Sequence, residues 1–157
     1  SSGLTQVGLE IELLPGGSLE GQLIGVSHET STTSTYGESK VFVERLGQYY
    51  SKGHGVECIV VRIGTVIPNE SEHWERGGRL QATAFLQADV SNFFCAAVQA
   101  DFSYWDSQSC EGHPNVPGFL LTAAQSDSPA RFIDLEPGIS ALGWTPIEWP
   151  TGPESLP

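Results

Sequence analysis

The fold is decided by residues 36–63, which read YGESKVFVERLGQYYSKGHGVECIVVRI. Phe42, Leu46, Tyr49 and Tyr50 recur at helical spacing, which predicts an amphipathic helix over residues 36–51 with Gly53 as its stop signal. The opposite side of this helix carries polar residues: Glu38, Glu44, Arg45 and Gln48. Residues 56–63 are β-branched and almost continuously apolar, as in a strand buried on both faces of a parallel sheet. A helix followed by a buried strand indicates α/β layering.

Outward from this stretch, the elements are separated by long irregular segments. Asp89 can cap a helix that runs to about Ala100, and residues 118–124 form a second apolar strand. Pro137-Gly138 interrupts a weaker helix over residues 131–142. Loops are expected at residues 3–35, 64–78 and 101–117 and in the tail from Trp144. Ser1-Ser2-Gly3 is either a cloning remnant or a sign that the chain starts within a domain.

Composition excludes several classes of protein. The 157 residues suit one domain, and 7 Lys+Arg against 19 Asp+Glu give a net charge of −12. That charge disfavours binding to nucleic acid and to an anionic membrane surface. The longest apolar run, residues 93–98, is far too short to span a bilayer, so we expect a soluble protein. Cys58, Cys95 and Cys110 show no C-x-x-C spacing, which favours a reducing, cytoplasmic location.

The strongest candidate for chemistry is the pair Tyr36 and Lys40. Residues four apart on a helix share a face, so the ammonium can stabilise a phenolate and make the tyrosine a usable acid or base. The alternative is an exposed pair in the first turn of a helix. Other candidates are weaker, because His28, His54, His73 and His113 lie in expected loops at irregular spacing, and we expect no metal site.

Several further residues have two interpretations. The loop residues Glu70, Glu72, His73, Trp74 and Glu75 either line a sugar pocket or are simply solvated. Trp144 and Trp149 either stack on a sugar or cap the core, and capping is favoured. Cys58 and Cys95 are expected to be core packing residues.

Four motifs in order along the chain carry a resemblance to a known family. They are Tyr36-Gly37-x-Ser39-Lys40, Arg62-Ile63-Gly64-Thr65 with Pro68, Phe85-Leu86 with Asp89, and Leu142-Gly143-Trp144-Thr145-Pro146. Together they resemble the extended short-chain dehydrogenase/reductase family, also called the NAD-dependent epimerase/dehydratase family, and within it the uronate-dehydrogenase branch. The resemblance extends over nearly the whole chain.

The resemblance implies an incomplete Rossmann-like fold, a doubly wound parallel sheet that lacks the N-terminal nucleotide-binding half. Residues 1–157 would then be the C-terminal catalytic and substrate-side part, with loop insertions near residues 3–35 and 101–117. The Gly-rich turn that meets the pyrophosphate in this fold is not found, since Gly53-His54-Gly55 follows a helix and Gly17, Gly21 and Gly25 lie in a loop.

The resemblance also implies the reaction and its residues. An NAD-dependent enzyme, with NADP left open, would exchange hydride with a sugar or sugar acid. Tyr36 would move the proton, Lys40 would assist it and hold the cofactor ribose, and Ser2 would orient the substrate oxygen. Backbone near Ile63 would touch the nicotinamide, and Thr65 and Arg79 would contact substrate.

Two other expectations concern the chain as a whole. It could be a truncated or degenerate non-catalytic module that keeps a sugar-binding or oligomer-forming surface. An open sheet edge also predicts self-association into a homo-oligomer. Without a nucleotide-binding half, the chain alone should bind NAD weakly or not at all.

Overall fold

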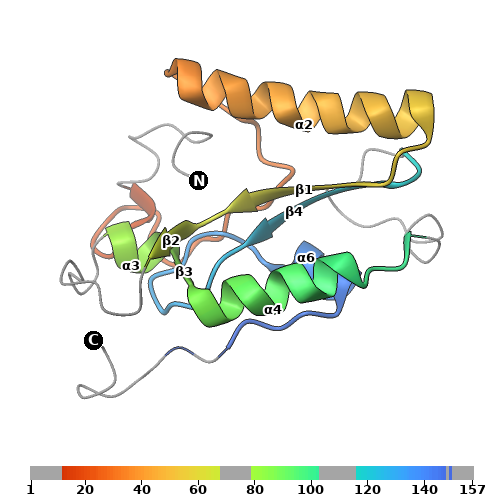
Figure 1. Ribbon diagram of the computed structural model, residues 1–157. Coiled ribbons are helices and arrows are strands. Elements are labelled where there is room, and N and C mark those ends of the chain that lie inside the picture. Colours follow the sequence, from red (N-terminus) through yellow and green to blue (C-terminus); the bar gives the residue numbers. More distant parts are fainter. Residues whose placement is uncertain (1–11, 68–78, 103–115, 148, 150–157) are drawn as a thin grey trace.

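The computed structural model describes residues 12–67, 79–102, 116–147 and 149. Along the chain the elements are α2 (Thr35–His54), β1 (Cys58–Ile63), β2 (Thr65–Ile67), α3 (Arg79–Thr83), β3 (Ala84–Leu86), α4 (Gln87–Val98), β4 (Phe119–Ala124) and α6 (Glu136–Leu142). Helix α2 covers one side of β1 and β4, and α4 and α6 lie on the other side (Figure 1). This layered α/β arrangement is the expected one.

The strands pair in parallel, as their apolar character predicts. β1 and β4 run side by side from Cys58 opposite Phe119 to Ile63 opposite Ala124, and β2 pairs with β3 in a second small sheet. All of β4 is buried, whereas β1 is half-buried throughout. The expectation that β1 is buried on both faces is therefore wrong here, because within the described residues its only ladder partner is β4.

Helix α2 forms where the sequence predicts it and extends further. The Ser34 hydroxyl caps the start by accepting a hydrogen bond from the Gly37 amide at 3.0 Å. The helix passes through Gly53 and ends at Gly55, whose φ of 64° is the left-handed conformation that glycine adopts at helix ends. Gly53 is thus not the stop signal.

Helix α2 buries its polar face, whereas an ordinary amphipathic helix buries its apolar face. Glu44 and Ser51 are buried, while Phe42 is 62% exposed and Tyr49 60% exposed. The close approach at Gly47 explains this, since a Cβ there would lie 2.7 Å from a methyl group of Val60. The small and polar stripe therefore docks on the sheet, and the aromatic stripe faces outward.

The main core lies between β4 and α4. The rings of Phe93 and Trp144 meet edge to face with centroids 5.2 Å apart, and Phe85 packs against Phe93 at 6.3 Å. Trp144 and Trp149 are both buried, which confirms that they cap the core. Cys58 packs against this core as expected, but Cys95 is exposed on α4, so its assignment as a packing residue is wrong.

Other boundaries differ from the sequence prediction. Residues 65–67 form β2 rather than loop, and α3 and β3 precede α4. Leu86 occupies the N-cap position of α4 without a side-chain cap, and Asp89 lies in the first turn as a buried acceptor instead of a cap. The last helix begins only at Glu136, because Pro137 is tolerated in the first turn of a helix but not inside one. In the described residues, no helix is long and apolar enough to cross a membrane.

Candidate active site

The first turns of α2 bring Tyr36 and Lys40 together. The Lys40 ammonium lies 4.8 Å from the centroid of the Tyr36 ring, which is within the range of a cation–π contact. Both residues are exposed, with Tyr36 62% accessible. The two side chains thus share one face of the helix, as their spacing predicts.

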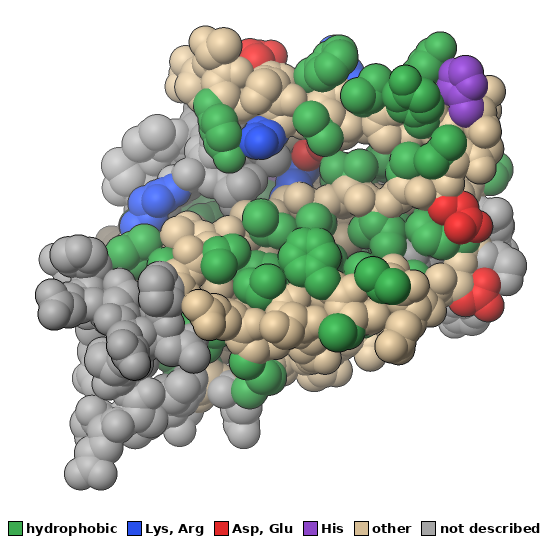
Figure 2. Space-filling view, in the orientation of Figure 1, with side chains coloured by type: hydrophobic (Ala, Val, Ile, Leu, Met, Phe, Trp, Pro, Cys, Tyr) green, Lys and Arg blue, Asp and Glu red, His purple; other side chains and the backbone are tan. Residues whose placement is uncertain are grey.

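This face borders a cavity of about 320 Å³ between α2 and β1. Tyr36 and Lys40 line it from the helix, and Ile63 lines it at the carboxyl end of the strand. Its other lining residues are Val43 and Glu44 of α2 and Ile59, Val60, Val61 and Arg62 of β1. Figure 2 shows hydrophobic side chains along α2 and on the surface beneath it, with basic side chains near the end where α2 begins. Apolar side chains therefore line much of the cavity, and basic side chains lie near the end at which α2 begins.

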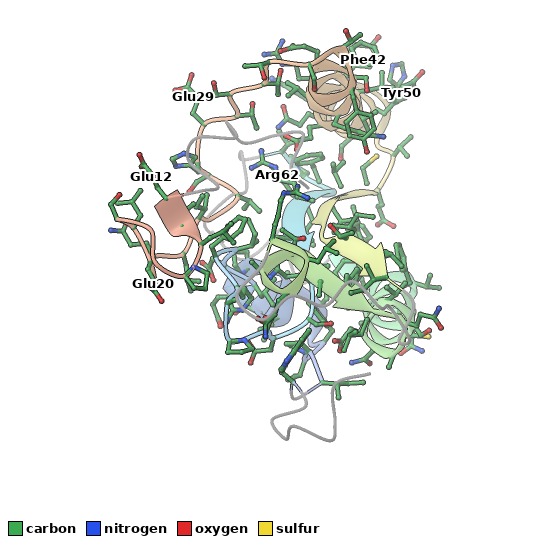
Figure 3. All side chains as sticks on the ribbon, turned by 90° about the vertical axis from the view of Figure 1, so that its left-hand side faces the viewer. Glu12, Glu20, Glu29, Phe42, Tyr50 and Arg62 are labelled. Carbon is green, nitrogen blue, oxygen red and sulfur yellow. The ribbon has the colours of Figure 1, made fainter. Side chains whose placement is uncertain are left out.

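An ion pair that the sequence analysis missed crosses this cavity. Arg62 donates from Nε to Oε1 of Glu44 at 2.8 Å and from Nη2 to Oε2 at 3.0 Å. Both side chains are largely buried, at 16% and 11% exposed. Figure 3 shows Arg62 beneath α2, on the side away from Phe42 and Tyr50. The available signal was one arginine in an otherwise apolar strand, together with a glutamate eight residues after Tyr36.

The residues expected to contact substrate lie on neighbouring elements. Thr65 begins β2, directly after the end of β1, and its hydroxyl lies 3.0 Å from the hydroxyl of Thr83. Thr83 also donates to the Arg79 carbonyl at 3.0 Å across one turn of α3. Through these contacts Thr83 links α3, which begins at Arg79, to the start of β2, where Thr65 lies.

Gly64 makes this junction possible. A Cβ at Gly64 would lie 2.3 Å from the Thr83 carbonyl oxygen, so only glycine allows α3 to approach the end of β1 this closely.

Other expected site residues lie elsewhere. Ser2, the loop residues 70–75, His73, His113 and Cys110 are outside the described residues. His54 stacks at the far end of α2, with its ring centroid 5.3 Å from those of Tyr49 and Tyr50. Within the described residues, no group of three His, Cys, Asp or Glu side chains is arranged to hold a metal ion.

Comparison with known proteins gives relatives among sugar dehydrogenases. The chain is 44% identical over 133 residues to L-arabinose 1-dehydrogenase (NAD(P)(+)) of Haloferax volcanii, a match that covers 81% of this chain and 47% of that protein. No family model matches the sequence. The chain thus spans about half the length of this curated relative.

Solved structures agree on the fold. A mutant of uronate dehydrogenase from Agrobacterium tumefaciens, complexed with NAD, superposes with a TM-score of 0.60 at 24% identity. Glucuronic acid dehydrogenase from Chromohalobacter salexigens gives 0.59 at 21% identity. Each match covers 81% of this chain and 40% of the other. The resemblance to the uronate-dehydrogenase branch is confirmed at the level of fold: the chain has part of the Rossmann-like architecture of these dehydrogenases.

Proposed function

We propose that the chain is the substrate-side part of an NAD(P)-dependent oxidoreductase that acts on a sugar or sugar acid by hydride transfer. The observation that carries this is the Tyr36–Lys40 contact at the carboxyl end of β1. In open parallel α/β sheets, ligands bind outside the carboxyl ends of the strands. The sequence similarity to a sugar dehydrogenase supports the same class of reaction.

The cavity suits one end of a dinucleotide. At about 320 Å³ it lies at the lower limit of typical ligand pockets, enough for a nicotinamide and its ribose. The pyrophosphate needs backbone amides at a helix start that follows a strand. Within the described residues, the positive-φ glycines before α2 are Gly16 and Gly21, which lie in turns and not between a strand and a helix. The described residues therefore account for contacts to the nicotinamide end alone.

Each residue has a distinct task in this proposal. A bound nicotinamide supplies the acceptor for hydride. Tyr36, as the phenolate that the Lys40 ammonium stabilises, would take the proton from the sugar hydroxyl and become the neutral phenol. Lys40 would also donate to the cofactor ribose. Ser2 would orient the substrate oxygen, and backbone near Ile63 would contact the nicotinamide. The exposure of Tyr36 leaves its hydroxyl accessible to a substrate.

Two residues beyond β1 support a proposal for the substrate class. Thr65 offers a hydroxyl to a sugar, and the Arg79 guanidinium can hold a carboxylate with two parallel hydrogen bonds. The relatives named above act on an aldose and on uronic acids. We therefore propose aldoses and uronates as the two substrates to test first.

Two further proposals concern the cellular compartment and the oligomeric state of the enzyme. The described cysteines, Cys58 and Cys95, are both free thiols, which supports a reducing compartment such as the cytoplasm. The exposed apolar face of α2 supports association of two copies of the chain.

The test compares the chain alone with a completed fold. The chain would replace the matching 133 residues of the Haloferax volcanii L-arabinose 1-dehydrogenase. We expect calorimetry to show no micromolar binding of NAD by the chain alone, and we expect the chimera to bind NAD and form NADH with an aldose or a uronate. A chimera that folds and binds NAD but oxidises no member of a sugar and uronate panel would favour the non-catalytic module instead.

A further inference from the structure

The buried ion pair between Arg62 and Glu44 has no task in the proposed reaction, yet it lies directly beside the residues that do. Tyr36, Lys40 and Glu44 are spaced four residues apart, so they form one stripe along α2. All three line the cavity together with Arg62 of β1. The stripe thus places a carboxylate one helical turn beyond the ammonium that contacts Tyr36.

A free carboxylate at this position would compete for Lys40. Lysine and glutamate four residues apart on a helix attract each other. An ammonium drawn toward Glu44 would move away from the Tyr36 ring, which lies in the opposite direction along the helix. The structure does not form this Lys40–Glu44 pair.

The structure shows why that pair is absent. Arg62 engages both carboxylate oxygens of Glu44 in the parallel geometry that only a guanidinium provides, at 2.8 and 3.0 Å. Lys40 instead lies over the Tyr36 ring at 4.8 Å. The charged or titratable groups that line the cavity are Tyr36, Lys40, Glu44 and Arg62, and β4, which also packs on α2, carries no charged residue.

On the basis of the function proposed above, we propose that Arg62 is a positioning residue: it holds the Glu44 carboxylate and thereby leaves the Lys40 ammonium on Tyr36. Arg62 touches neither the reacting atoms nor Tyr36 in this account and acts through Lys40. The pair is then a neutral unit: removing Arg62 alone frees the Glu44 carboxylate to attract Lys40, whereas removing both members leaves Lys40 on Tyr36.

The test follows the ionisation of Tyr36 in the purified chain. The chain contains four tyrosines, so it is labelled with ¹³C at the tyrosine Cζ, and the Tyr36→Phe variant assigns the Tyr36 signal. We expect Tyr36 to lose its proton at a higher pH in Arg62→Met than in the wild-type chain, because Lys40 would turn from the Tyr36 ring toward the unpaired Glu44 carboxylate. The double variant Glu44→Gln/Arg62→Met should return the midpoint to that of the wild type, because no carboxylate is left to draw Lys40 away.

Two comparisons separate positioning from a general effect of charge. Arg45→Met removes an exposed positive charge from the same helix and should leave the Tyr36 midpoint unchanged. In a Lys40→Met background, Arg62→Met should shift the midpoint by less than half as much as it does with Lys40 present. An equal shift in both backgrounds, or no shift in folded Arg62→Met, would overturn the proposal.

Folding of the variants is checked by the dispersion of the NMR spectrum. Arg62→Gln, which removes the charge but keeps an amide donor, is measured in parallel and replaces the methionine variant if that variant unfolds. The titration needs neither cofactor nor sugar. A negative result therefore refutes the role of Arg62 and leaves hydride transfer to be judged by the chimera.

Discussion

Asp89 shows how one buried carboxylate holds together three parts of the chain. It is fully buried in the first turn of α4 and accepts hydrogen bonds from the Ser126 hydroxyl and, at 2.6 Å, from the Ile147 amide. The Ser126 hydroxyl in turn accepts a hydrogen bond from the Leu86 amide at 2.9 Å. Helix α4, the segment after β4 and the tail that follows Trp144 are thus joined at one residue.

Asp89→Asn should destabilise the fold by about 2 kcal/mol. The amide keeps the shape of the side chain but loses the charge and one acceptor, so the buried hydroxyl of Ser126 loses its partner. Asp127→Asn is the matched control, because Asp127 is half exposed and its pair with Arg131 is of the surface type, worth less than about 1 kcal/mol. Urea unfolding followed by circular dichroism measures both variants. Equal losses of stability would contradict the role assigned to Asp89.

At the scale of elements, the position of α2 was predictable and its orientation was not. The spacing of Phe42, Leu46 and Tyr49 correctly indicates a helix, but these side chains face outward. The usual assumption that the apolar stripe faces the core fails, because the docking stripe consists of Gly37, Glu44, Gly47 and Ser51. Glu44 can be buried only because Arg62 pairs with it, and a contact between residues 18 apart leaves no periodic signal.

Local sequence patterns predict some of the other elements, whereas elements that depend on contacts distant in sequence are missed. The two long strands and the Tyr36–Lys40 contact follow from local patterns, and both are confirmed in position. Strands β2 and β3 have three residues each, too few to show a period, and only their pairing with each other defines them. The junction at Gly64 likewise depends on the approach of α3 from elsewhere in the chain.

Two glycines of α2 give a matched test of its docking. Gly53→Ala should stabilise the chain by about 0.5–1 kcal/mol, because a Cβ there meets nothing within 4 Å and alanine is the better helix former. Gly47→Ala should instead destabilise it by about 1 kcal/mol, since its Cβ would lie 2.7 Å from Val60 and 3.1 Å from the Phe119 ring. Thermal unfolding of both variants measures the difference. A stabilised Gly47→Ala variant would show that α2 does not dock as described.

At the scale of the whole molecule, the outward face of α2 predicts self-association. Phe42, Val43, Leu46, Tyr49 and Tyr50 are between 38% and 62% exposed along one helix. A single charge placed among them should weaken a dimer strongly, so Phe42→Glu is expected to raise its dissociation constant about tenfold or more. Val98→Glu, at an 86% exposed position on α4, is the control and should have little effect. Sedimentation velocity over a range of concentrations measures both, and a chain that stays monomeric at hundreds of micromolar would contradict the prediction.

In the proposed reaction, Tyr36 moves the proton while hydride passes between the sugar and the nicotinamide. The most direct measurement is the rate of NADH formation by the chimera with Tyr36 and with Tyr36→Phe, together with the dissociation constant of NAD for each. Loss of one hydroxyl should lower kcat by about 10²–10⁴-fold, the range for general acid–base catalysis, and leave NAD binding within a few-fold. A Tyr36→Phe chimera that turns over at the unmodified rate would refute the role of Tyr36 in proton transfer.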